Sequence, residues 1–368
     1  MLSLRKLSGL VFGHDDHDPL CGTLRAVDVP VSSADCRSCS DPCDLGHDAY
    51  PRRGFDIDME TPMLGTVKPY QRQIVISTGR SDWERDITEA SGSLAASMAE
   101  VIRTHKAQAK DDHNHKHGHG KHDHGNGVPK SPKLHAGVFR PSDSTKISTL
   151  NGSHRTLCED HDRETVLVFP DYKVVTEVRR NVQGAQDLWD SAVKPELDQR
   201  GAFLEKSPLK TWVLPYSCVI LLCSHRKRDA RCGIAAPKLE HALIKSLEAQ
   251  GWEADTELEH PSHTMGAPLE DLKVTPEQRE ENIALQLKES TESKRALILM
   301  VSHVGGHKYA GNVIIYTPSG SGVWYGRVTP HDVDSIVENT IIKGLVLPPL
   351  LRGGMNLSKP NCKSLNDW

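Results

Sequence analysis

Two apolar runs that lead into cysteine and histidine residues constrain the fold of this chain most. Val219 to Leu222 leads directly into Cys223, and Leu297 to Val301 leads into a short loop with His303 near its start. Short apolar runs bounded by polar segments are typical of buried strands in layered α/β proteins. Because such folds carry their functional groups in the loops that follow the strands, the sequence predicts a site where these two strands end.

Four residues make up the predicted site: Cys223, Cys232, His303 and His307. Cys232 stands at the start of a predicted helix, where backbone N–H groups and the helix dipole favour a thiolate. The Val-Gly-Gly segment between the two histidines allows a turn tight enough for both imidazoles to face one centre. Thiolates and imidazoles are ligands of zinc and of iron, so we interpret the four residues as a metal site.

The spacing of the cysteines bears on what the site holds. Eight residues separate Cys223 from Cys232, whereas the paired cysteines of zinc fingers are about two to four residues apart. The wider spacing suits a metal group that is larger than a single ion. A structural zinc site with the same four ligands is one alternative. A thiol oxidoreductase is another, although the C-x-x-C pair of Cys36 and Cys39 does not follow a predicted strand.

Length and charge narrow the class of protein. At 368 residues the chain has the length of two domains. A formal net charge of −4 indicates no basic surface, so no nucleic-acid partner is predicted. No apolar run approaches the roughly 20 residues that cross a bilayer, so no membrane association is predicted either.

The N-terminal segment and the cysteine content predict a reducing compartment. Acidic residues at positions 15, 16 and 18 argue against a secretory signal and a mitochondrial presequence, and the chain is expected to be cytoplasmic. Nine cysteines are too few for a disulfide scaffold of this length. Clustered cysteines in a reduced protein indicate metal binding or redox chemistry.

Residues 1–52 are interpreted as a leader, because they show neither helical nor strand periodicity. The leader contains Cys36, Cys39 and Cys43, with His47 as a conceivable fourth ligand of a zinc knot. An ordered loop with adventitious thiols is the simpler interpretation.

Residues 53–205 are predicted to form a first α/β unit, with strands at 73–77, 165–169 and 173–178 and helices at 82–106 and 183–197. A histidine-rich insertion at 105–135 interrupts it, and the tract from His113 to His124 contains no core-forming residue. Such a tract is typical of a solvated insertion that binds metals weakly. A metal-buffering role for the tract is therefore a further alternative.

Residues 206–352 are predicted to form a second α/β unit, followed by a tail at 353–368. Its strands are expected at 216–222, 295–301, 311–317 and 322–328, and its helices at 232–251 and 332–342. Leu239, Leu243 and Leu247 share one face of the first of these helices. The polar segment 253–294 is expected to be an insertion with one helix near 276–288.

Three segments of the second unit resemble the sucrase/ferredoxin-like family: Cys223 to Pro237, His303 to Asn312 and Trp324 to Pro330. Within it they are most similar to the actin patches distal protein branch. The resemblance is strong over residues 205–345 and extends weakly to residues 60–64 and to Asp82 and Trp83.

This resemblance implies a thioredoxin-like ferredoxin fold and a 2Fe–2S cluster held by Cys223, Cys232, His303 and His307. It implies electron transfer with protein donors and acceptors, in redox homeostasis or in resistance to redox-active compounds. No nucleophile–base pair, phosphate loop or dinucleotide fingerprint is found, so an electron carrier is expected rather than an enzyme. His225 belongs to the family pattern without being an expected ligand, and it either supports a ligand by a hydrogen bond or is a solvated loop residue.

Formal charges show what two histidines would do to such a cluster. Two ferric ions, two sulfides, two thiolates and two neutral imidazoles sum to zero, whereas four thiolates would leave a negative centre. Adding an electron to the less negative cluster is easier, so histidine ligation raises the reduction potential. Because imidazoles titrate, electron uptake is expected to be coupled to proton uptake.

The chain ends with Leu365-Asn-Asp-Trp368. This end resembles the short tail by which cytosolic iron–sulfur proteins are recognised for cluster insertion, although Asn366 replaces the usual aliphatic residue. The resemblance implies that the cytosolic iron–sulfur assembly machinery binds Asp367 and Trp368. The alternative is a disordered tail that happens to end in tryptophan.

Overall fold

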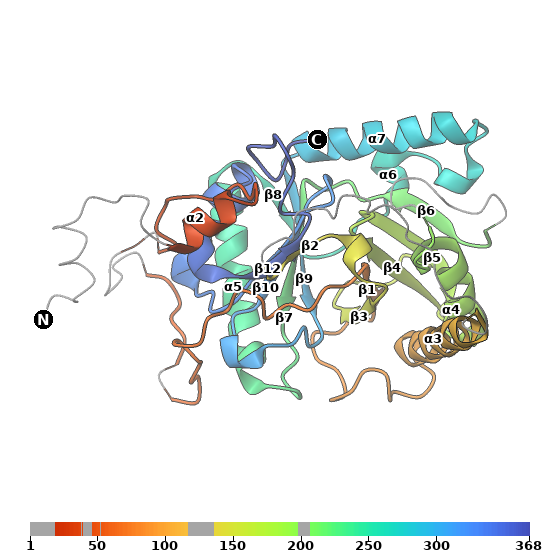
Figure 1. The fold of residues 1–368 in the computed structure, drawn as a ribbon, viewed down its shortest axis with the longest axis horizontal. Helices are drawn as coiled ribbons and strands as arrows, with labels where there is room; N and C mark the ends of the chain where they lie inside the picture. The colour runs from red at the N-terminus through yellow and green to blue at the C-terminus, as the bar shows by residue number, and fades with distance from the viewer. Residues whose placement is uncertain (1–18, 38, 40–45, 52, 117–135, 198–206) are drawn as a thin grey trace, which may run out of the picture.

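One mixed β-sheet runs through the molecule (Figure 1). The computed structural model describes residues 19–368 except 38, 40–45, 52, 117–135 and 198–206. The sheet has twelve strands in the order β2-β12-β11-β10-β7-β9-β3-β1-β4-β5-β6, with β8 beside β9. Helices lie on both of its faces, which confirms the predicted α/β class.

The first unit is built as a strand, a helix, a parallel strand, an antiparallel hairpin and a helix. These elements are β1 (Arg72–Ser77), α3 (Leu94–Lys116), β3 (Ile147–Gly152), β4 (Arg163–Phe169), β5 (Lys173–Arg179) and α4 (Val182–Leu188). Strand β1 is parallel to β3 and antiparallel to β4, which pairs with β5. Strand β6 (Lys210–Val213) continues the sheet beyond β5.

The second unit repeats this topology. Its elements are β7 (Cys218–Cys223), α5 (Ala230–Ala249), β9 (Arg295–Val301), β10 (Val313–Tyr316), β11 (Gly322–Tyr325) and the helical turns α8 (Val333–Ser335) and η6 (Ile336–Ile342). Strand β7 is parallel to β9 and antiparallel to β10, which pairs with β11. The two units meet where Gly152 of β3 pairs with Val301 of β9, so their sheets become one.

Short strands complete the sheet around the second unit. Strand β12 (Leu351–Met355) pairs with β11, β2 (Val138–Phe139) pairs with β12, and β8 (Glu253–Asp255) pairs with β9. Glycines prevent β12 from showing a strand pattern in the sequence, and β8 is polar, so neither was predicted. Strand β3 was missed for a related reason, because its sequence, Ile-Ser-Thr-Leu-Asn-Gly, contains only two large apolar residues.

Strand β7 is a continuous apolar run because it is covered on both faces. Ile220 and Leu222 share a core cluster with Leu239 and Leu243 of α5. On the other face, Val219 and Leu221 share a cluster with Ile283 and Leu287 of α7 (Pro276–Glu292). Each fully buried side chain of this kind contributes roughly 1.5–3 kcal/mol. This two-sided burial makes the end of β7 a rigid platform for Cys223.

The helix that was predicted at 82–106 begins later, at Leu94. Ser93 provides the cap, because its Oγ accepts the N–H of Ala96 at 3.1 Å. Residues 81–85 instead form an extended loop that contacts the second unit. Apolar periodicity alone could not show that this segment has partners elsewhere in the chain.

Part of the leader packs on the second unit. Helix α2 (Pro19–Arg25), which has no counterpart in the sequence-based expectation, buries Leu24 in the core cluster that contains α5. Val31 forms a parallel bridge with Val346. Cys43 and residues 117–135 of the histidine-rich insertion lie outside the described residues. In the part of the chain that the structure describes, no helix is long and apolar enough to cross a membrane.

Candidate functional site

The two predicted ligand segments meet at one end of the sheet. Strands β7 and β9 run parallel in a register that pairs Cys223 with Val301, so the loops that follow them are neighbours. Cys223 is the last residue of β7, and Cys232 is the third residue of α5. Both cysteines are buried. Asp229 caps α5 by accepting the N–H of Arg231 at 3.0 Å, which fixes the turn that holds Cys232.

The two thiols are coupled. A hydrogen bond with the Cys232 thiol lowers the pKa of Cys223 well below its ordinary value, and the His303 side chain and the Val304 N–H contribute in the same direction. The same hydrogen bond, together with burial, raises the pKa of Cys232. The directions are opposite because the first proton lost by the pair comes from Cys223 and the resulting thiolate holds the second proton in place. Of the two buried thiols, Cys223 is therefore the one whose negative form the surroundings favour.

The histidine loop depends on two glycines with left-handed backbones. Gly305 and Gly306 have φ of 83° and 68°, and they turn the chain between His303 and His307. The centroids of the two imidazole rings are 5.6 Å apart. The His303 Nδ1 atom is buried, and it has no hydrogen-bond partner among the described residues. A buried nitrogen without a hydrogen bond is costly. The His303 side chain interacts with the Cys223 thiol, so its ring lies beside the sulfur pair.

A buried arginine that the sequence did not reveal fixes the histidine loop from behind. Arg352 of β12 donates hydrogen bonds to the Gly305 carbonyl at 3.1 Å and to Asn312 Oδ1 at 2.6 Å. Burial lowers the pKa of Arg352 to about 10, and the nearby Cys223 thiolate opposes this shift. A Cβ atom on Gly306 would lie 2.2 Å from the Arg352 Nη2 atom, so only glycine fits there.

His225 supports the site and is not a solvated loop residue. It is 1 % exposed, and its Nδ1 atom accepts the backbone N–H of His303 at 3.2 Å. Its Nε2 atom lies 3.0 Å from the carbonyl oxygen of Trp83. Since Nδ1 acts as an acceptor, the proton of the neutral ring belongs on Nε2. This hydrogen-bond chain ties the histidine loop to the first unit.

A loop of the first unit covers the segment after Cys223. Ser224 donates to the carbonyl of Ser81 at 2.6 Å, and the N–H of Lys227 donates to Asp82 Oδ1 at 3.1 Å. Arg228 reaches the carbonyl of Arg85 at 3.0 Å. The site therefore has a wall that belongs to the first unit, which explains why Asp82 and Trp83 share in the resemblance stated above.

A leader thiol contacts a histidine of the second unit. Cys39 Sγ is 2.8 Å from His331 Nδ1, and the rings of His47 and His331 have centroids 5.2 Å apart. Burial, followed by the charge of Asp332, raises the pKa of Cys36 to about 12. His331 had no signal in the sequence, because it comes from the distant 3-10 turn Pro330–Asp332.

The candidate ligands are donors that soft and borderline metals accept, although they are not arranged as a site for one ion. Among the residues that the structure describes, no group of three or more His, Cys, Asp or Glu side chains is arranged to hold a single metal ion. The buried thiol of Cys223 and the buried Nδ1 of His303 are nevertheless soft and borderline donors at the end of the same two strands.

The last residues of the chain are packed against the second unit. Leu365 is buried, and the Asp367 carboxylate accepts the N–H groups of Lys363 and Ser364. Lys359 donates to the carbonyl oxygen of Asp367 at 3.2 Å. Trp368 is 50 % exposed. The indole of Trp368 is therefore half exposed at the end of a segment that packs on the second unit.

Comparison with known proteins places the chain in a family. The family model described as sucrase/ferredoxin-like matches residues 63–353. The chain belongs to the sucrase/ferredoxin-like family. The match includes both units and all four candidate ligands, so the family pattern covers the site together with the loop of the first unit that covers it.

Several fungal proteins are similar to this chain. Actin patches distal protein 1 of Saccharomyces cerevisiae is 27 % identical over 329 residues, which cover 88 % of this chain and 84 % of that protein. Altered inheritance of mitochondria protein 32 of Meyerozyma guilliermondii is 32 % identical over 138 residues, covering 38 % of this chain and 35 % of that protein. The protein of the same name from Debaryomyces hansenii is 28 % identical over 209 residues, covering 52 % and 60 %. No solved structure matches the chain.

Proposed function

We propose that this protein is a one-electron carrier with a 2Fe–2S cluster held by Cys223, Cys232, His303 and His307. The observation that carries the proposal is the position of the buried thiols of Cys223 and Cys232 and the buried Nδ1 atom of His303 at the ends of the neighbouring parallel strands β7 and β9. Membership of a family described as ferredoxin-like supports an iron–sulfur group over a single ion. Electron donor and acceptor are proposed to be proteins.

The fold supports this proposal. The strand order β11-β10-β7-β9, with β10 antiparallel to its neighbours, is the order of thioredoxin-like domains. In this arrangement Cys232 lies in the first turn of α5, next to Cys223 at the end of β7. Arg352 adds a buried positive charge near the sulfur pair.

The cluster, when bound, would accept and return one electron, and the protein residues would set how readily it does so. Two neutral imidazoles in place of thiolates leave the oxidised centre less negative, which raises its reduction potential. His225 and Arg352 would hold the histidine loop in one conformation during the electron transfer. Such a carrier is suited to redox homeostasis or to resistance to redox-active compounds.

The direct test is chemical analysis of anaerobically purified protein. We expect two irons and two acid-labile sulfides for each chain, a red-brown colour and an EPR signal after reduction. The variants Cys223→Ser, Cys232→Ser, His303→Ala and His307→Ala should each change the visible spectrum. Cys362→Ser is the matched control, because Cys362 is a half-buried thiol of the C-terminal tail. A colourless protein with one zinc would establish the structural zinc alternative instead.

We also propose that the packed tail is the signal for cluster insertion and that the protein works in the cytosol. Trp368 is half exposed, and the hydrogen bonds of Asp367 hold the segment that precedes it. This arrangement supports recognition of Asp367 and Trp368 by the assembly machinery. Removal of these two residues should lower the iron content of protein made in cells. Unchanged iron content would contradict this role. Cell fractionation tests the compartment, and a mitochondrial pool would contradict the cytosolic assignment.

A further inference from the structure

A second group of metal-ligating side chains lies where the leader packs on the second unit. The Cys39 Sγ atom is 2.8 Å from the Nδ1 atom of His331. The ring of His47 is next to the ring of His331, with centroids 5.2 Å apart. Cys39 and His47 belong to the leader, whereas His331 comes from a 3-10 turn that lies 292 residues after Cys39. The fold therefore gathers one thiol and two imidazoles from distant segments of the chain.

Hydrogen bonds fix the leader to the second unit on either side of its thiol and imidazole. Before the thiol, the hydroxyl of Ser335 donates to the carbonyl oxygen of Asp35 at 2.9 Å. After the imidazole, the hydroxyl of Tyr50 donates to the carbonyl oxygen of Val328 at 2.7 Å. Val328 and Ser335 flank His331 in the sequence, so both attachments hold the leader at the turn that carries this histidine.

The turn that carries His331 is itself held in place. The Asp332 Oδ2 atom accepts the backbone N–H of Thr329 at 2.8 Å and the Thr329 hydroxyl at 2.7 Å. Asp332 is buried, so water competes little for these bonds. The backbone on both sides of the contact between Cys39 and His331 is therefore fixed by hydrogen bonds.

One nitrogen of this group has no hydrogen bond. The Nε2 atom of His47 is buried, and it has no hydrogen-bond partner among the described residues. Buried polar atoms are normally paired, because leaving one without a partner costs free energy. A metal ion on the lone pair of Nε2 would remove this cost. The unpaired nitrogen beside a thiol–imidazole contact therefore points to a bound cation.

The separation of the two rings fits a single tetrahedral ion. With Zn–N bonds of about 2.0–2.1 Å, two imidazoles on one tetrahedral zinc have ring centroids roughly 5 Å apart. The contact between Cys39 and His331 is a hydrogen bond, in which a proton occupies the place of the metal. No three such side chains of the described residues already surround one ion. On a zinc ion the Cys39 Sγ and His331 Nδ1 atoms would be roughly 3.5 Å apart, so a separation by less than about 1 Å admits the metal.

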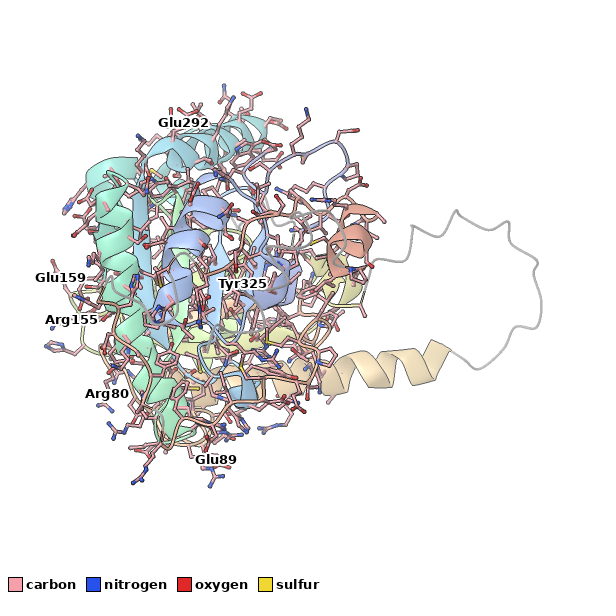
Figure 2. All side chains as sticks on the ribbon, turned by 90° about the vertical axis from the view of Figure 1, so that its left-hand side faces the viewer. Arg80, Glu89, Arg155, Glu159, Glu292 and Tyr325 are labelled. Carbon is pink, nitrogen blue, oxygen red and sulfur yellow. The ribbon has the colours of Figure 1, made fainter. Side chains whose placement is uncertain are left out.

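Cys36 is not counted as a ligand, although its C-x-x-C spacing from Cys39 would permit this. Its side chain packs against the core cluster that contains α5. Burial and, to a smaller extent, the Cys36 thiol raise the pKa of Tyr325, which lies fully buried near the centre of the view in Figure 2. The Cys36 thiol therefore faces the core. Three protein ligands are enough, because zinc accepts water or a further donor in its fourth position.

We propose that Cys39, His47 and His331 bind one zinc ion that clamps the leader to the second unit. One thiolate and two imidazoles are donors that suit zinc and not magnesium or calcium. Because the leader supplies two ligands and the second unit supplies one, the ion links the two segments directly. None of the three belongs to the candidate ligands of the cluster, so either proposal can fail without the other.

Metal analysis of the full-length protein, purified without chelators from zinc-supplemented cells, tests this site. About one zinc for each chain should be present, and Cys39→Ser and His331→Ala should each retain at least fivefold less zinc at unchanged iron content. His331→Cys should keep the zinc, because it keeps a ligand at the same position, and this separates loss of the metal from loss of the fold. His241→Ala and Cys362→Ser are the controls, since His241 is exposed on α5 and Cys362 lies in the tail.

Two further measurements report on the same ion. X-ray absorption at the zinc edge should show sulfur at about 2.3 Å and nitrogen at about 2.0–2.1 Å, with the outer-shell signal of imidazole. Trypsin should cleave after the exposed Arg37 at least threefold faster in His331→Ala than in the wild type, because the clamp is lost. His331→Cys should be cleaved like the wild type.

Three results would overturn the proposal. Wild-type protein without zinc would show that the three side chains bind no metal. Zinc that stays in Cys39→Ser and His331→Ala but is lost in Cys223→Ser would belong to the candidate cluster ligands, as the structural zinc alternative requires. Zinc that falls equally in His241→Ala would be adventitious.

Discussion

Replacing Arg352 with methionine should destabilise the histidine loop by a predictable amount. The guanidinium group is buried and donates hydrogen bonds to the Gly305 carbonyl, to Asn312 Oδ1 and to Thr66 Oγ1. Methionine fills much of the same volume without a donor. Three acceptors, of which Asn312 is buried and Thr66 is exposed, would each lose about 1 kcal/mol or less, and relief of the buried charge offsets part of this. We expect a net loss of about 2 kcal/mol, or a melting temperature lower by about 3 °C for a chain of this length.

The same variant tests the charge of Arg352. Because Cys223 raises the pKa of Arg352, the guanidinium reciprocally stabilises negative charge on the sulfur pair. Arg352→Met should therefore lower the reduction potential of the proposed cluster, since the added electron loses a nearby cation. Arg352→Lys keeps the charge but not the planar fork, so it should restore the potential more fully than the stability.

Thermal unfolding and redox titration measure the two effects of the Arg352 variants. Arg103→Met is the control, because Arg103 is exposed on α3. A melting temperature within about 1 °C of the wild type for Arg352→Met would refute the hydrogen-bond reasoning, because about 2 kcal/mol should be lost. An unchanged potential would refute the electrostatic reasoning separately.

Three further predictions concern single residues. His225→Ala leaves the backbone N–H of His303 without its acceptor, so chemical denaturation should show a loss of about 1–3 kcal/mol, whereas a variant as stable as the wild type would mean that water replaces the ring. Gly306→Ala forces a side chain into the left-handed region and against Arg352, so the iron content of the purified protein should fall, and full iron content would contradict the tight packing. Burial lowers the pKa of His154 to about 4, whereas the unfolded chain binds this proton at about pH 6.5. The free energy of unfolding should therefore be highest above about pH 6.5 and decrease by about 3 kcal/mol as the pH falls toward 4. His154→Leu should flatten that part of the pH profile, and an unchanged slope would assign it to other groups.

The sequence predicted the positions of some residues near the site, but not the roles of others. Cys223 and His303 could be placed at strand ends because β7 and β9 are covered on both faces, and such strands are continuous apolar runs. Strand β9 was predicted with its observed bounds, Arg295–Val301. The ligand role of the four residues stays a prediction. His225 belongs to the family pattern, but its surroundings in the sequence do not predict its role. A buried histidine in a polar loop looks like a solvated one until its hydrogen-bond partners are known.

By itself, the amino-acid sequence determined the α/β class, the central strands of each unit, the helix that carries Cys232 and the family. Each of these depends on local periodicity or on a contiguous motif. Only the tertiary structure decided that the two units share a sheet through Gly152 and Val301, that Arg352 lies behind the histidine loop, and that Trp83 holds His225. These features join residues that are far apart in the chain, and the free energy that selects them comes from burial and hydrogen bonds formed only when both segments are in place.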